Sequence, residues 1–126
     1  MIENHKNEAI VYYNGERNVD KGILAYVNSY FNHVRTLDVS RQKIADTRLE
    51  EIAMRLGVPI AELINHDCAA YQKFANVLDE ENDEDCIKII QHYPDLLRTP
   101  IVITKDRAIF ARGTTDIMNL LSEKAW

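Results

Sequence analysis

The N-terminal third of the chain constrains the fold most, because it has the pattern of strand, helix and strand. Residues 9–13 are a β-branched and aromatic run that stops at an Asn-Gly pair. Apolar residues then recur at helical spacing over residues 23–31, with Asp20 placed near the helix start to suit its dipole. Residues 34–39 give a second strand signal. The helix is long enough for a parallel crossover, so the pattern predicts a βαβ unit.

The C-terminal third changes to the short period of strands. Residues 101–103 and 108–110 flank a Lys-Asp pair, which predicts a tight hairpin. Gly113 and the two threonines after it predict the start of a last helix. The order βαβ, then ββα, favours one mixed sheet covered by helices, an α/β fold.

The middle of the chain is predicted to be helical. Thr47 and Glu50 have the spacing of a capping box, and Gly57 is placed to end the helix that they open. Pro59 is predicted to start a further short helix. A later helix is predicted to bury one apolar stripe, formed by Cys86, Ile89, Ile90 and Tyr93.

Length, charge and cysteine content limit the class of protein to which this chain can belong. A chain of 126 residues fits a single domain, residues 1–126, in which we expect the polar residues 1–7 to be disordered. The net charge of −5 argues against direct nucleic acid binding by bulk charge. No run approaches a membrane span, and the two cysteines make no disulfide framework, so we expect a cytoplasmic protein without a membrane partner. The consecutive residues 66–68 (His, Asp, Cys) lack ligand spacing, so we expect no metal and no cofactor.

Several segments in order carry a family resemblance. Residues 92–104 (HYPDLLRTPIVIT) resemble a His-Pro-x-Leu-x-x-Arg-Pro-Ile-Val strand entry, and Arg112 follows Pro100 by twelve residues. Residues 12–14 (YYN) resemble the start of a Tyr-x-Asn-Pro-x-Cys loop. Over residues 10–121 the chain resembles the arsenate reductase and Spx family of thioredoxin-fold proteins. The resemblance implies a thioredoxin-like mixed sheet (βαβ … ββα) with an inserted helical region.

The chain departs from that family at the positions that carry chemistry. By the resemblance, Arg17 falls where the nucleophilic cysteine would be, and Asn65 falls where a mid-chain arginine would be. Thr99 stands directly before the key proline, with Arg98 displaced by one residue, and only Arg112 keeps its place. A guanidinium stays protonated and offers only donors, so it cannot act as a thiolate. The resemblance itself implies a bacterial protein. Arg17 in place of the cysteine implies that this protein is redox-inactive.

Three interpretations of Arg17 are open. It is either a solvated loop charge or, with Arg112, part of a small oxyanion site at the N–H groups of the helix start. A cation at a helix N-terminus is mildly disfavoured unless an anion is bound, and a misaligned loop is a third alternative.

Two interpretations of Pro100 are open. Statistics alone favour a trans bond and a turn proline that starts a strand. The resemblance implies a cis bond facing the first helix, next to which the backbone of Thr99 recognises an extended partner chain. The predicted binding residues are therefore Asn14, Arg17, Thr99, Pro100 and Arg112.

The sequence thus predicts a non-catalytic binding or regulatory module with a protein partner and, as a further ligand, a small oxyanion. The Spx branch of the family is regulatory and acts through RNA polymerase. The alternative is a thiol oxidoreductase that uses external glutathione or Cys68, with His66 activating the thiol. Cys68 and Cys86 also fit the commoner role of cysteines that pack helices.

Overall fold

A computed structural model describes residues 8–78 and 83–124, and it divides into two compact units. We call residues 8–41 and 99–124 the sheet unit and residues 42–98 the helical unit. The predicted disorder of residues 1–7 lies outside the described residues, and the single domain stays a prediction.

The sheet unit has the predicted βαβ … ββα order. Its elements are β1 (Glu8–Tyr13), α1 (Asn18–Tyr30), β2 (His33–Asp38), β3 (Ile101–Thr104), β4 (Ala108–Phe110) and α5 (Thr114–Lys124). The four strands form one sheet in the order β2-β1-β3-β4, with β1 parallel to β2 and antiparallel to β3. β3 and β4 form the predicted antiparallel hairpin. The mixed α/β sheet with helices is therefore confirmed.

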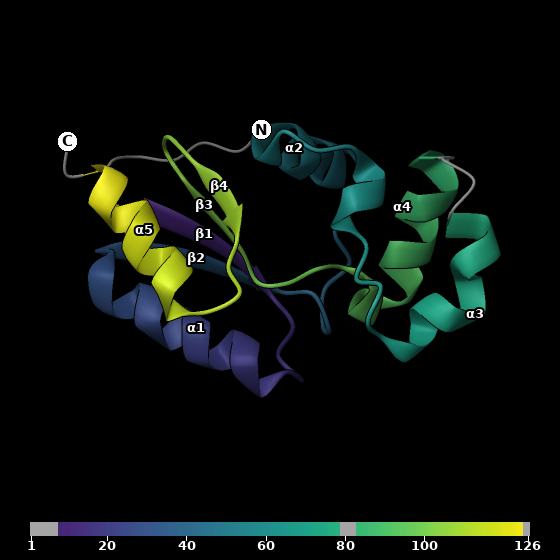
Figure 1. Ribbon diagram of the computed structural model, residues 1–126, viewed down its shortest axis with the longest axis horizontal. Coiled ribbons are helices and arrows are strands. Elements are labelled where there is room, and N and C mark those ends of the chain that lie inside the picture. The colour runs from purple at the N-terminus through teal and green to yellow at the C-terminus, as the bar shows by residue number, and fades with distance from the viewer. Residues whose placement is uncertain (1–7, 79–82, 125–126) are drawn as a thin grey trace. The chain divides into compact units, whose positions relative to one another are not determined.

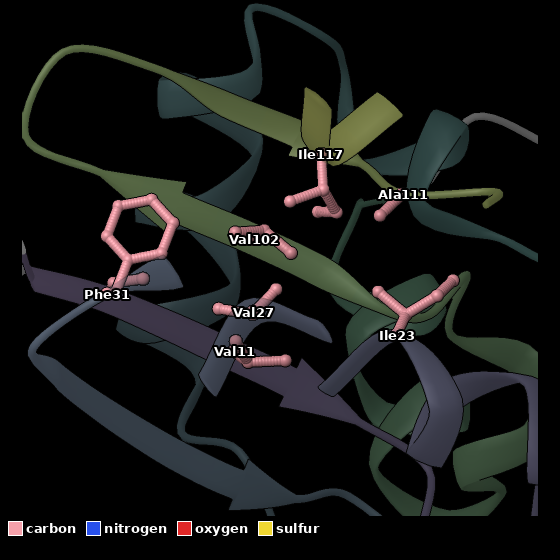
Figure 2. Close-up of a cluster of buried hydrophobic side chains, with 8 residues drawn as sticks. Val11, Ile23, Val27, Phe31, Val102, Ala111 and Ile117 are labelled. Atoms are coloured by element: carbon pink, nitrogen blue, oxygen red, sulfur yellow. The ribbon is translucent and has the colours of Figure 1, made fainter. Parts of the chain in front are cut away.

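The core of the sheet unit lies between one face of the sheet and the helices α1 and α5 (Figure 1). Alternate residues of β1 point to this face, where Val11 pairs with Val102 of β3. Figure 2 shows the side chains of both strands meeting those of the two helices. The cluster consists of Ala9, Val11, Ile23, Val27, Phe31, Val102, Ala111 and Ile117. Burying each of the larger side chains stabilises the fold by about 1.5–3 kcal/mol.

The helical unit contains α2 (Asp46–Leu56), η1 (Ile60–Leu63), α3 (Ala69–Leu78), α4 (Asp83–His92) and η2 (Pro94–Leu96). Gly57 ends α2 as predicted, in the left-handed conformation with φ 73° that favours glycine. Pro59 precedes η1, also as predicted. An isolated antiparallel bridge joins Ile64 to Leu97.

Two sequence predictions for the helical unit are wrong. The capping box fails because α2 begins earlier, at Asp46, after Ala45, which makes no side-chain cap, so Thr47 already lies inside the helix. On α4 the residues that accompany Cys86 are Ile87 and Ile90, while Ile89 is only partly buried. Tyr93 lies beyond the helix, 38% exposed, and packs its ring against Phe74 of α3. The stripe is therefore confirmed at Cys86 and Ile90 and wrong at Ile89 and Tyr93, because the buried face continues through Ile87.

Candidate functional site

Hydrogen bonds donated by its peptide N–H groups hold the loop between β1 and α1, residues 14–17. The buried Asn14 accepts from Glu16 N–H through Oδ1 (3.0 Å) and from Arg17 N–H through its carbonyl oxygen (3.0 Å). Carboxylates outside the loop accept from the other two, Asp20 from Asn14 N–H (2.9 Å) and Asp38 from Gly15 N–H (2.9 Å). All four N–H groups thus have acceptors, and Asn14, predicted as a binding residue, shapes the loop.

Asp38, at the end of β2, ties this loop to the sheet. Its Oδ1 accepts from Gly15 N–H, and from the N–H (3.0 Å) and hydroxyl (2.6 Å) of Ser40. Burial alone would raise the pKa of Asp38, but the hydrogen bonds from Ser40 and Gly15 and the charge of Arg41 hold the pKa below its usual value. The carboxylate is therefore anchored as an acceptor of three hydrogen bonds.

Arg17 stands at the N-cap of α1 and reaches two other residues of the sheet unit. Its Nε lies 3.8 Å from Asp20 Oδ1, and its Nη1 donates to Thr99 Oγ1 at 3.5 Å. The side chain is 40% exposed, so part of the guanidinium faces solvent. The structure thus joins Arg17 to Thr99, two of the predicted binding residues, and makes Arg17 more than a solvated charge.

Asp20 is the residue of this site that sequence reasoning missed. Its side chain is completely buried in the first turn of α1. Oδ2 accepts from Asn14 N–H, whereas Oδ1 has no hydrogen-bond donor among the described residues. The sequence signalled only the ion pair, since Asp20 follows Arg17 by three residues, the spacing at which helical side chains meet, and it did not signal the burial of the carboxylate.

The bond between Thr99 and Pro100 is cis, as the family resemblance implied. The carbonyl oxygen of Pro100 accepts from Ala111 N–H at 3.0 Å, which fixes the segment before the last helix. The peptide N–H and C=O of Thr99 make no hydrogen bond to any residue in the described part of the chain. Thr99 is partly exposed, so this residue offers a free backbone donor and acceptor.

Arg112 is exposed, and its backbone N–H donates to Asp116 Oδ2 at 2.7 Å. Within residues 8–78 and 83–124 its guanidinium forms no ion pair, and no hydrogen bond connects it to Arg17. An oxyanion site shared by the two arginines stays a prediction.

The helical unit uses Asn65 and Arg98 for internal contacts. Asn65 N–H donates to the carbonyl oxygen of Leu96 at 2.6 Å, and its Oδ1 accepts from Asp67 N–H at 3.0 Å. Arg98 Nη1 donates to the carbonyl oxygen of Glu62 at 3.0 Å and lies 3.9 Å from its Oε2. Both side chains therefore have a structural role within this unit.

The two cysteines have different surroundings. Cys86 is 1% exposed, which confirms that it packs in a core. Cys68 is partly exposed directly before α3, and its Sγ donates to the carbonyl oxygen of Asn65 at 3.4 Å. That contact needs the proton on sulfur, whereas the nucleophilic form of a thiol is the thiolate. Among the described residues no hydrogen bond joins His66 to Cys68, and the ring of His66 lies against that of Tyr71 with 4.5 Å between the ring centroids.

Neither a cluster of metal ligands nor a membrane-spanning helix is found in the described part of the chain. Among those residues no group of three His, Cys, Asp or Glu side chains is placed to hold a metal ion. Within the same ranges no helix is both long and apolar enough to cross a membrane.

Comparison with known proteins places this arrangement in a family. The model of the ArsC family matches residues 16–119. An arsenate reductase from Vibrio cholerae has a similar structure, with a TM-score of 0.76 and 15% identity over 89% of this chain and 96% of that chain. An arsenate reductase (ArsC) related protein from Brucella melitensis has a TM-score of 0.64 and 11% identity, covering 93% and 97%. At these identities the structures show the fold alone. No curated protein sequence matches the chain.

Proposed function

This chain belongs to the ArsC family, and we propose that it is a non-catalytic member that binds an extended segment of a protein partner at Thr99. The observation that carries the proposal is the free peptide of Thr99 beside Pro100. A free N–H and C=O on one residue can pair with a partner strand through the main chain. Partner recognition of this kind needs no thiol.

The residues around Thr99 support recognition over chemistry. The described residues of the sheet unit contain no cysteine, because the two cysteines are Cys68 and Cys86. By the family resemblance Arg17 replaces the nucleophile, and here its guanidinium holds the Thr99 hydroxyl and the Asp20 carboxylate. Arginine supplies donors but no attacking electron pair. The role we assign to this site is therefore binding, of the regulatory kind known from the Spx branch, in a cytoplasmic protein.

A peptide selection tests the proposal. We expect selection of random peptides on the immobilised protein to return binders whose affinity falls at least about tenfold when one backbone N–H is methylated, the loss of about one buried hydrogen bond. Binding should also slow hydrogen exchange of the Thr99 amide. Binders that tolerate methylation at every position, or that leave the Thr99 amide unprotected, would refute recognition through this peptide group.

Two arginine variants make a matched pair for the same titration. Arg17 and Arg41 each place Nε 3.7–3.8 Å from an aspartate three residues away, but only Arg17 reaches Thr99. Arg17→Ala should weaken the selected peptides, and Arg41→Ala, whose side chain is 85% exposed, should not. Equal effects of the two substitutions would mean that peptides respond to net charge and not to this site.

A further inference from the structure

The start of α1 contains the donors from which an oxyanion site is built. The N–H groups of Asn18, Val19 and Asp20 make no hydrogen bond to any described residue, as is usual for a first helical turn. The exposed part of the Arg17 guanidinium lies at the same helix end. Open N–H groups, the helix dipole and a guanidinium together favour phosphate, sulfate or arsenate.

Asp20 opposes that preference from inside the same turn. Its carboxylate is completely buried, and the Oδ1 atom that has no hydrogen-bond donor is the atom 3.8 Å from Arg17 Nε. An anion bound to Arg17 would therefore lie close to a second negative charge that water does not screen. The ion pair with Asp20 also neutralises the positive charge of Arg17 to which an anion would bind.

In place of the oxyanion site predicted from the sequence, we propose that Asp20 is a specificity-determining residue that excludes small oxyanions from the start of α1. With Asp20 in place, the guanidinium of Arg17 is left to contact uncharged acceptors, such as the peptide carbonyl groups of an extended partner. This inference rests on the proposed function for the choice of ligand, but the exclusion of oxyanions is a property of Arg17 and Asp20 alone.

The size of the effect follows from Coulomb repulsion. For unit charges about 5 Å apart, at the effective dielectric constant of about 20 that suits sites near a protein surface, repulsion weakens binding on the order of a hundredfold. Salt and relaxation of the loop reduce this figure. We therefore expect removal of the Asp20 charge to strengthen phosphate binding by at least about tenfold.

The test is titration of Asp20→Asn with inorganic phosphate, followed by calorimetry and by the amide signals of Asn18 and Val19. Asparagine keeps an oxygen that can accept from Asn14 N–H and removes the charge. Asp116→Asn is the matched control, because Asp116 is also the third residue of its helix and also accepts from the backbone N–H of a residue that precedes the helix. The double variant Arg17→Gln/Asp20→Asn removes the cation as well.

We expect Asp20→Asn to bind phosphate at least about tenfold more tightly than the wild type, Asp116→Asn to match the wild type, and the double variant to lose the gain. An unchanged affinity in Asp20→Asn would overturn the inference. An equal gain in both asparagine variants would also overturn it, because net charge would then be the cause. If circular dichroism shows Asp20→Asn unfolded, Asp20→Ser is titrated with the same expectations. Peptide selection that fails while phosphate is still excluded would refute the proposed function alone.

Discussion

Replacing Gly15 by alanine should test whether Asp38 anchors the site loop. A Cβ atom at Gly15 would clash with Asp38 Oδ2 and would lie 2.8 Å from Asp38 Cγ, well inside van der Waals contact. The carboxylate must then leave its place, and it would lose the hydrogen bonds from Gly15 and Ser40. Gly15 is not in the left-handed conformation, so alanine strains nothing else in the backbone.

The cost can be worked out from those contacts. A hydrogen bond to a charged group contributes about 1.5–3 kcal/mol, and the displaced carboxylate regains part of this from water because it already lies near the surface. Alanine also restricts the unfolded chain, which stabilises the fold by about 0.4–1 kcal/mol. We therefore expect Gly15→Ala to lower the free energy of unfolding by about 2 kcal/mol.

A double-mutant cycle with Asp38→Ala isolates the anchor. Without the carboxylate the clash is gone, so Gly15→Ala should be neutral or stabilising in that background, a coupling of about 2–3 kcal/mol. Urea unfolding followed by circular dichroism gives the four free energies. If Gly15→Ala costs the same with and without Asp38, the clash is not with this carboxylate and the reasoning is wrong.

Two further predictions concern pH and activity. Because the pKa of Asp38 is lower in the folded protein than in the unfolded chain, the stabilisation by its carboxylate is complete above the unfolded pKa of about 4 and is lost as the pH falls through the folded pKa. In urea unfolding between pH 7 and pH 2, the wild type should therefore be more stable than Asp38→Asn by an amount that shrinks only at acidic pH. A constant difference in stability would contradict this. The purified protein should not reduce arsenate with glutathione and glutaredoxin, since Arg17 supplies no thiolate. Turnover above a protein-free control would disprove this prediction, and the Cys68→Ser variant would then show whether the Cys68 thiol is responsible.

Local sequence signals determined most of the sheet unit. The β-branched and aromatic run of β1, the apolar spacing of α1 and the turn between β3 and β4 each depend on residues close in sequence, and the strands were predicted within one residue of their bounds. The helices of the helical unit were harder to predict, because the residues at which they begin are not set by side-chain caps. α2 begins after Ala45, and no helix of its own was predicted over the residues of α3.

The site was predicted in part, for a physical reason. The pairing of Arg17 with Thr99 joins residues 82 positions apart, and only the family resemblance brought them together. The roles of Asp20 and Asp38 depend on burial and on backbone N–H groups, neither of which a residue pattern displays. An aspartate in the first helical turn suits the dipole whether it is solvated or buried, so the sequence alone favoured the simpler reading.

The β1–α1 loop connects stability and specificity through two carboxylates with different tasks. Asp38 accepts three hydrogen bonds, so its charge is compensated by donors and it serves the shape of the loop. Asp20 accepts from one N–H and leaves Oδ1 facing Arg17, so its charge is compensated mainly by the guanidinium. Neutralising Asp38 should therefore affect mostly folding, whereas neutralising Asp20 changes the net charge that a ligand meets at α1. An acidic chain can in this way keep an arginine at a helix N-terminus without turning that end into an anion site.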